Sequence, residues 1–142
     1  MNRRKRIVFC ALFFMMLVAG TVYGQSDGSG EKAAPPFPSY GIGKTIVRIY
    51  TDYFCPPCRA AEPKLEQALE NAFKRGVVTV TFVDTPIYQH SPLYARYFLY
   101  VINGSNSFER AMAARKVLFE AAEKKITEKE KLEGFLKERG IS

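Results

Sequence analysis

Residues 45–58 read TIVRIYTDYFCPPC, and they hold the strongest structural signal in this chain of 142 residues. Residues 45–50 are rich in β-branched and aromatic side chains, a composition typical of a β-strand. The predicted strand leads into the turn Cys55-Pro56-Pro57-Cys58. The sequence therefore predicts a Cys-x-x-Cys motif directly after a strand.

A helix and a second strand are predicted beyond this turn. From Cys58 to Arg75, alanine, leucine and phenylalanine recur at helical spacing, and Gly76 ends the pattern. Residues 77–83 (VVTVTFV) then read as a largely buried strand. A strand–helix–strand unit with a crossover of this length implies parallel pairing and a right-handed connection. The predicted fold class is α/β, with a βαβ core that carries the Cys-x-x-Cys motif at a helix N-terminus.

The rest of the chain is predicted to be helical. Ser91 can cap a helix with Pro92 at its first position, and this helix continues to about Ile102. Two more helices are predicted from capping boxes, whose paired residues are Asn106 with Glu109 and Thr127 with Glu130. Gly140 is expected to stop the last helix.

The cysteine pair is the candidate catalytic site. The spacing places the two thiols within disulfide reach, and the free N–H groups and positive dipole end of the helix favour the thiolate form of Cys55. Pro56 and Pro57 carry no N–H, so the amide of Cys58 is the expected backbone partner of the sulfur. We expect Cys55 to attack, Cys58 to resolve the mixed disulfide, and Phe54 to shield the pair. This chemistry requires no cofactor and no metal.

Three other interpretations of the pair are weaker. A structural disulfide across so small a loop restrains little of the unfolded chain. A zinc site with His90 as third ligand lacks a fourth ligand at convincing spacing. The pair could also be an unused active site. The alternative to an enzyme is therefore a secreted binding module, or a truncated inactive product, with a structural disulfide.

Three neighbouring residues are candidate modulators of the thiols. Asp52 lies three residues before Cys55 and can tune its proton affinity, although such an aspartate more often ends a strand by bonding the turn backbone. His90 is the only histidine, and a capping or surface role is the simpler expectation for it. Arg59 can adjust the local potential, although a solvated position explains it equally well.

The N-terminal segment is typical of an export signal. Residues 2–6 (NRRKR) are positive, and the apolar run at residues 7–22 is shorter than the about 20 residues of a membrane-spanning helix. Residues 1–24 are therefore predicted to be a signal peptide, or alternatively an uncleaved anchor, and residues 25–39 a flexible linker before a domain at residues 40–142. A periplasmic or other extracytoplasmic location follows, where a thiol pair can exist as a disulfide.

Charge and composition exclude several other classes. The net charge of +7 includes Arg3, Arg4, Lys5 and Arg6 of the predicted leader, and 17 basic against 14 acidic residues remain without them. No basic face is then left for nucleic acid. Three cysteines are too few for a disulfide-rich scaffold or a four-thiolate zinc site.

Residues 46–58, together with Pro63 in the following helix, resemble the thioredoxin superfamily. The aromatic-Asp-aromatic approach to Cys-Pro-x-Cys, and residues 84–87 (DTPI) followed by His90, are most similar to its extracytoplasmic DsbA-like branch. The resemblance implies a thioredoxin fold interrupted by inserted helices. It also implies thiol–disulfide exchange with the thiols or disulfides of secreted client proteins, served by a membrane or soluble redox partner.

One departure from that family is expected to leave the sheet incomplete. The family adds a β-hairpin, a final helix and a cis-proline loop that faces the cysteines, whereas no proline or strand-like run follows Ile126. Either residues 93–102 form the first inserted helix, or Pro92 is the cis-proline and residues 93–101 are the next strand. Consecutive apolar residues at 97–101 favour the helix. Open sheet edges would then make the chain marginally stable or dependent on a partner.

Overall fold

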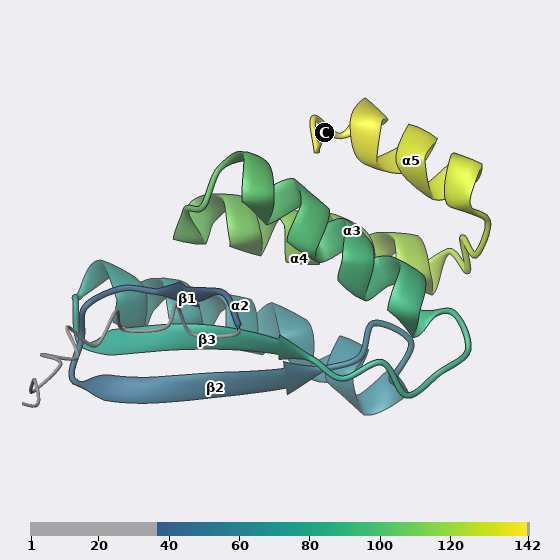
Figure 1. Ribbon diagram of the computed structural model, residues 1–142. Coiled ribbons are helices and arrows are strands. Elements are labelled where there is room, and N and C mark those ends of the chain that lie inside the picture. Colours follow the sequence, from purple (N-terminus) through teal and green to yellow (C-terminus); the bar gives the residue numbers. More distant parts are fainter. Residues whose placement is uncertain (1–36, 142) are drawn as a thin grey trace, which may run out of the picture. The chain divides into compact units, whose positions relative to one another are not determined.

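The computed structural model describes residues 37–141 (Figure 1). The predicted signal peptide, residues 1–24, and residues 25–36 of the predicted linker lie outside this range. The elements follow the order β1 (Ser39–Tyr40), β2 (Thr45–Thr51), α2 (Pro56–Lys74), β3 (Val78–Asp84), α3 (Ser91–Gly104), α4 (Phe108–Glu123) and α5 (Lys129–Glu138). The predicted α/β class, with a βαβ core followed by helices, is confirmed.

The sheet has the strand order β1-β3-β2 within the described part of the chain. β2 and β3 are parallel and pair without a break from Thr45 opposite Val78 to Thr51 opposite Asp84. The antiparallel strand β1 was not predicted from the sequence. Ser39, which the sequence assigned to the linker, instead pairs with Thr81 of β3.

The core lies on the face of β3 that carries Val80 and Phe82, both of which are almost fully buried. Phe98 of α3 meets Phe82 edge-on at 6.0 Å between ring centroids. Phe73 of α2 stacks on Phe108 of α4 at 3.9 Å. Helices from three parts of the sequence therefore pack against one face of the sheet, and their aromatic rings form the hydrophobic centre of the fold.

α3 settles the choice between a helix and a strand after His90. The helix starts at Ser91 with Pro92 in its first turn, and residues 37–141 contain no cis peptide bond. Tyr94 and Phe98 lie four residues apart, as one helical face requires, and both are buried. The favoured interpretation, an inserted helix, is confirmed over a cis-proline followed by a strand.

The predicted helix caps were wrong by about one residue at three starts. α4 is capped by Ser107 rather than Asn106, and the Ser107 hydroxyl oxygen accepts a hydrogen bond from the Arg110 N–H at 3.1 Å. α5 begins after Glu128 rather than Thr127, without a capping side chain among the described residues. The Ser91 hydroxyl donates to Asp52 instead of capping α3. No described helix is both long and apolar enough to cross a membrane.

Candidate functional site

The cysteine turn joins the C-terminal end of β2 to the start of α2. Cys55 is the N-cap residue of α2, with φ −73° and ψ 116°, and Pro56 opens the helix. The Cys55 N–H donates to the Asp52 carbonyl at 3.2 Å, and the Cys55 carbonyl accepts from the Arg59 N–H at 3.0 Å. The prolines fit because the first helical N–H groups need no partner within the helix. Cys55 is thereby held at the positive end of the helix dipole, as the sequence predicted.

Cys55 and Cys58 are both half-buried free thiols, and their sulfurs lie within hydrogen-bond reach. Cys58 packs against the hydrophobic core. Burial raises the pKa of the Cys58 thiol, and its contact with the Cys55 sulfur and the nearby Asp52 carboxylate act in the same direction. The pair is therefore asymmetric, and its second sulfur is held as a protonated thiol.

Asp52 is the polar centre of the site. Its Oδ1 accepts hydrogen bonds from the Phe54 N–H at 2.8 Å and from the Ser91 hydroxyl at 2.6 Å. Its Oδ2 accepts from the N–H groups of Ile87 at 2.7 Å and Tyr88 at 3.2 Å. Burial alone would raise the pKa of Asp52, but these four donors outweigh it and hold that pKa below its usual value. Asp52 thus ties the cysteine turn to the segment before α3.

The structure also gives the contacts of Phe54, His90 and Arg59, the other residues predicted around the cysteines. The Phe54 ring lies edge-on to Tyr94 at 4.8 Å and 5.8 Å from the ring of His90, so it links the turn to α3. His90 precedes α3 as its N-cap residue. Arg59 contributes the backbone N–H described above, and its side chain is half-buried. No group of three or more potential metal ligands within residues 37–141 is arranged to hold an ion.

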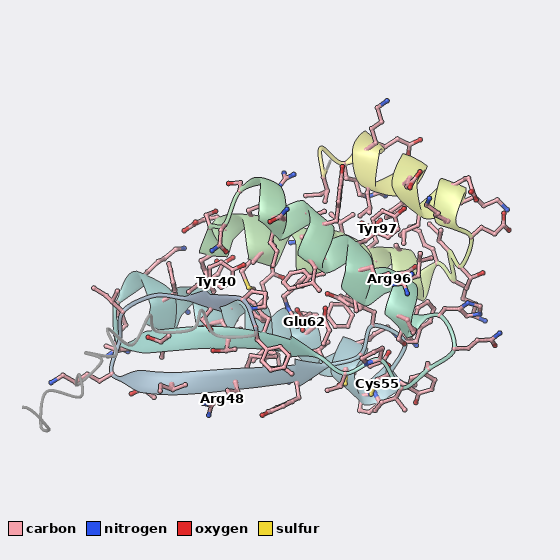
Figure 2. The ribbon with its side chains drawn as sticks, in the orientation of Figure 1. Tyr40, Arg48, Cys55, Glu62, Arg96 and Tyr97 are labelled. Atoms are coloured by element: carbon pink, nitrogen blue, oxygen red, sulfur yellow. The ribbon has the colours of Figure 1, made fainter. Side chains whose placement is uncertain are left out.

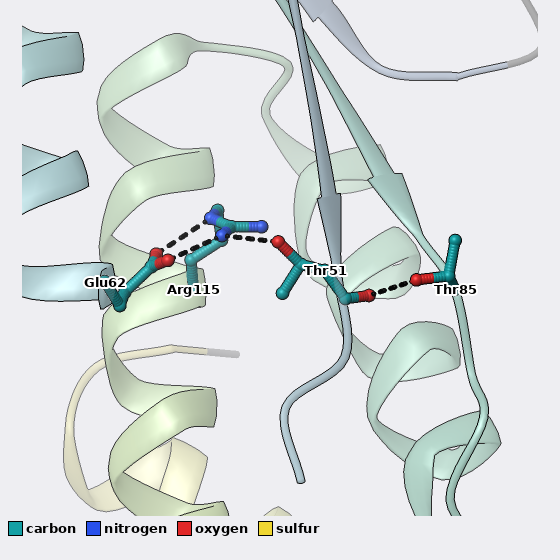
Figure 3. A network of polar contacts seen from close by, with 4 residues as sticks. All are labelled: Thr51, Glu62, Thr85 and Arg115. Carbon is teal, nitrogen blue, oxygen red and sulfur yellow. Dashed lines mark hydrogen bonds and ion pairs between the residues drawn. The ribbon is translucent and has the colours of Figure 1, made fainter. Parts of the chain in front are cut away.

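A buried ion pair that the sequence did not reveal supports the helix behind the cysteines (Figure 3). Arg115 of α4 donates from Nε to Glu62 Oε1 at 3.1 Å and from Nη2 to Glu62 Oε2 at 2.9 Å. The same Nη2 reaches Thr51 Oγ1 at 3.2 Å, and the Thr51 carbonyl accepts from the Thr85 hydroxyl at 3.1 Å. Arg115 thereby joins α2, α4 and the ends of β2 and β3.

A second buried acid lies beside this ion pair. Both carboxyl oxygens of Asp84 are shielded from solvent and make no hydrogen bond of standard geometry within residues 37–141. Burial raises the pKa of Asp84 to about 6, although the positive charge of Arg115 and the neighbouring Tyr53 hydroxyl oppose the change. The signal in the sequence was its position, since Asp84 ends a buried parallel strand next to the one that precedes Asp52.

A groove of the described residues lies away from the cysteines. It has a volume of about 750 Å³ and runs between α3 and α5. Its lining includes Tyr97, Tyr100 and Leu136, and none of its residues belongs to the cysteine turn. This groove is therefore separate from the cysteine turn.

Comparison with protein families decides the membership of the chain. A family model described as thioredoxin matches residues 42–140, which include both cysteines and all elements from β2 to α5. The chain belongs to the thioredoxin family. The resemblance to the thioredoxin superfamily that was drawn from the sequence is thereby confirmed. A comparison with curated protein sequences found no match.

Two solved structures show the same fold. The thiol–disulfide exchange protein alpha-DsbA2 from Wolbachia pipientis superposes with a TM-score of 0.58 at 20% sequence identity, over 75% of this chain and 54% of that one. Alpha-DsbA1 from the same organism superposes with a TM-score of 0.55 at 15% identity, over 76% of this chain and 56% of that one. The chain thus shares the fold of these two proteins and spans little more than half of their length.

Proposed function

We propose that this protein is an exported thiol–disulfide oxidoreductase that exchanges disulfides with secreted client proteins through its Cys-Pro-Pro-Cys site. The observation that carries the proposal is the asymmetric cysteine pair of a thioredoxin-family chain. Cys55 stands at the N-terminus of α2, and Cys58 is packed against the core with a raised pKa. Cys55 is then the nucleophile and Cys58 the resolving thiol.

The reaction needs only the sulfur atoms of the two proteins. The Cys55 thiolate attacks one sulfur of a client disulfide, that S–S bond breaks, and one client cysteine leaves as a thiolate. Cys58 then loses its proton to solvent and attacks the Cys55 sulfur. The second client thiolate leaves, and a Cys55–Cys58 disulfide remains. Two electrons have passed to the client, and the reverse sequence oxidises a client dithiol.

The location and partners follow from the same proposal. The leader at residues 1–24 directs the chain to the periplasm or another extracytoplasmic space, either as a cleaved signal or as an anchor facing that space. A membrane or soluble dithiol/disulfide partner returns the cysteine pair to its starting state. Nucleic acid is not a partner.

A trapping experiment tests the exchange. In the full chain with Cys10 changed to alanine, Cys58→Ala removes the resolving thiol and leaves Cys55. Incubation with an unfolded, disulfide-containing polypeptide is expected to accumulate a mixed disulfide that dithiothreitol releases on a gel. The matched variant Cys55→Ala, also without Cys10, is expected to form far less adduct because the remaining Cys58 is held as a thiol.

The outcomes separate an enzyme from a binding module. Adduct that depends on Cys55 supports exchange. If neither variant forms an adduct, the pair is a structural disulfide and the chain is a thioredoxin-like binding module. If both variants form equal adduct, the assigned roles of the two cysteines are wrong.

A further inference from the structure

The loop between β1 and β2, residues 41–44, holds an isoleucine in solvent. Gly41 has a φ of +92°, and Gly43 lies so close to β3 that a Cβ there would be 2.1 Å from the Val78 nitrogen. The Gly43 N–H donates to the Val78 carbonyl at 3.2 Å. This packing fixes the loop across the start of β3 and leaves the side chain of Ile42 97% exposed.

The residues before β3 lie beside this loop. The Thr45 N–H donates to the Val77 carbonyl at 3.3 Å, and the Thr79 hydroxyl donates to the Gly43 carbonyl at 2.8 Å. Val77 is 43% exposed and adds a second apolar side chain to this end of the sheet. Two separate connections, one after β1 and one after α2, therefore form a single surface.

This surface is positively charged. Lys44, Lys74 and Arg75 are all exposed. Lys44 and Arg75 form no ion pair with any of residues 37–141, and Lys74 pairs with the exposed carboxylate of Glu70 at 3.7 Å. Exposed apolar side chains thus lie among cations, on a surface that we call the basic tip and that consists of Ile42, Lys44, Lys74, Arg75 and Val77.

The exposure of the basic tip does not depend on further strands in the sheet. β3 has a neighbour on each side, in the order β1-β3-β2. A strand added at either edge would lie beside β1 or β2, whereas residues 41–44 lie across the N-terminal end of β3. The basic tip therefore stays open whichever edge is extended.

The chemistry of the basic tip fits an anionic lipid surface. A bilayer with anionic headgroups offers negative charge at its surface and an apolar layer beneath, so it accommodates both the cations and Ile42. A second copy of the chain would bring like charges together, and a polyanion without an apolar layer would leave Ile42 in water. The proposed export places the chain beside a membrane, and to this extent the inference rests on the proposed function.

The basic tip and the cysteine turn lie at opposite ends of the sheet. Figure 1 shows the connection from β1 to β2 at the left end of the sheet, and Figure 2 shows Cys55 beyond the C-terminal end of β2. The seven residues of β2 separate the two ends by about 20 Å. A bilayer in contact with the basic tip therefore leaves the cysteines open to a client.

We propose that the basic tip docks the protein on an anionic bilayer surface, with Ile42 inserted below the headgroups and with Lys44 and Arg75 at the lipid phosphates. The apolar side chain supplies the insertion, and the cations supply the preference for anionic lipid. Docking holds the cysteine turn on the side of the protein that faces away from the membrane.

A tryptophan reporter tests the docking. The chain contains no tryptophan, so Ile42→Trp places a single fluorophore at the basic tip. The full-length variant is reconstituted into vesicles of phosphatidylcholine alone or with added phosphatidylglycerol, each with and without lipids brominated on their acyl chains. Quenching by brominated lipid is expected only where phosphatidylglycerol is present. Tyr100→Trp, at a 70% exposed position of α3, is the control and is expected to be quenched in neither.

Charge removal tests the role of the cations. Added to Ile42→Trp, the pair Lys44→Gln and Arg75→Gln is expected to lower the ratio of lipid-bound to free tip about 25-fold, since each cation near an anionic surface contributes about fivefold. The quenching in vesicles with phosphatidylglycerol measures this ratio. Arg96→Gln with Lys137→Gln removes the same charge from exposed positions of α3 and α5 and is expected to leave the quenching unchanged.

Each result decides the proposal. No quenching at position 42 overturns the docking, and a blue-shifted emission without quenching would show that protein, rather than lipid, covers the basic tip. Equal quenching in both lipid compositions, or equal losses from the two pairs of charge substitutions, overturns the assignment to anionic lipid. The trapping experiment does not involve the basic tip, so the exchange activity is decided separately.

Discussion

One aspartate directly follows β2 and another ends the neighbouring strand β3, and the two carboxyl groups have opposite surroundings. Asp52 follows β2 and accepts four hydrogen bonds, from Ser91 and three backbone N–H groups. Asp84 ends β3, and within residues 37–141 its oxygens accept none of standard geometry. The pKa of Asp52 is lowered despite burial, whereas burial raises the pKa of Asp84 to about 6.

The comparison shows that hydrogen-bond donors outweigh the effect of burial on the pKa of Asp52, whereas burial dominates the pKa of Asp84. Asp52 faces backbone N–H groups that are fixed in place, so its negative charge is stabilised wherever the fold is intact. Asp84 has the positive charge of Arg115 nearby, but that charge is already shared with Glu62. Asp52, after β2, therefore stays ionised and holds its hydrogen-bond donors in place, whereas Asp84, at the end of β3, titrates at a pH of about 6.

The largest effect is expected from Arg115→Met, which removes the cation between the two acids. Glu62 would be left buried without a partner, and loss of one member of a buried ion pair costs about 3–5 kcal/mol in the free energy of unfolding. The pKa of Asp84 should rise further, because the charge of Arg115 lowers it. Urea unfolding of the full chain at pH 7 measures the loss.

A double variant is the control for this prediction. Arg115→Met combined with Glu62→Met replaces the whole pair by apolar side chains of similar length. It is expected to recover most of the lost stability, since no unpaired charge remains. If the double variant is as unstable as Arg115→Met alone, packing of the guanidinium over Phe82, at 4.6 Å from the ring centre, would account for the loss instead.

The second prediction concerns Asp52, whose carboxylate binds both the cysteine turn and the segment before α3. In Asp52→Asn, an amide NH₂ replaces one carboxylate oxygen. This donor then faces either the N–H groups of Ile87 and Tyr88 or the Phe54 N–H and the Ser91 hydroxyl. We expect a loss of about 3 kcal/mol, the scale of unsatisfied buried donors. The pKa of the Cys58 thiol should fall because the Asp52 carboxylate helps to raise it.

Unfolding in urea and the pH dependence of Cys58 alkylation measure the two effects of Asp52→Asn. Glu138→Gln, on an exposed carboxylate of α5, is the matched control and should change neither quantity. A variant that unfolds at the same urea concentration as the parent would show that Asp52 does not anchor the turn.

Much of this fold was predictable because it depends on local patterns. The strands β2 and β3 and the helix between them follow from composition and spacing, and parallel pairing follows from the length of the crossover. β1 has only two residues, and nothing local marks it, because it exists through the pairing of Ser39 with Thr81. Asn106 and Ser107 are both favoured N-cap residues, so only the path of the backbone could choose between them.

The candidate site likewise contains residues that local sequence patterns predict and residues that they do not. The cysteine pair was found from its spacing, and Asp52 from its position at the end of a strand. Glu62 and Arg115 are 53 residues apart, and neither lies in a motif, so a single sequence gives no signal that they meet. The donors to Asp52 from Ile87 and Ser91 lie at least 35 residues away in the chain and likewise depend on tertiary contacts.

The third prediction concerns Asp84, whose carboxyl oxygens accept no hydrogen bond of standard geometry within residues 37–141. An unfolded aspartate has a pKa of about 3.9, and that of Asp84 is raised to about 6. Between these values the folded chain keeps a proton that the unfolded chain releases, so stability falls as the pH rises from about 4 to about 6. Asp84→Asn cannot ionise, and we expect it to gain about 3 kcal/mol in the free energy of unfolding at pH 7 and little at pH 4.

Urea unfolding of parent and Asp84→Asn chains across this pH range checks the sign. The groups that act on the Asp84 carboxyl are Arg115, Tyr53, Asp52 and Glu62. The Arg115 charge favours ionisation, and burial opposes it more strongly. A variant that is less stable than the parent at pH 7 would mean that ionised Asp84 pairs productively with Arg115.

The smallest effect is expected from removal of the Ser91 hydroxyl, which donates a hydrogen bond to Asp52. Ser91→Ala removes one of the four donors to Asp52 without opening the backbone contacts. One hydrogen bond to a charged group contributes about 1.5 kcal/mol, so the loss should be about half that of Asp52→Asn. The pKa of Asp52 should rise, because the Ser91 hydroxyl is the strongest of the donors that lower it.

The effect of Ser91→Ala on the free energy of unfolding is also expected to depend on pH. A lowered carboxylate pKa adds stability above its unfolded value of about 3.9, and that stability is lost as the pH falls through the folded value. Ser91→Ala raises the pKa of Asp52 in the folded chain. The parent should therefore have a higher free energy of unfolding than the variant at pH 5, and this difference should shrink toward pH 2. Ser105→Ala, an exposed serine after α3, should show no such dependence. An advantage that stays constant down to pH 2 would place the effect of Ser91 in the packing of α3, because a neutral contact has no reason to titrate with Asp52.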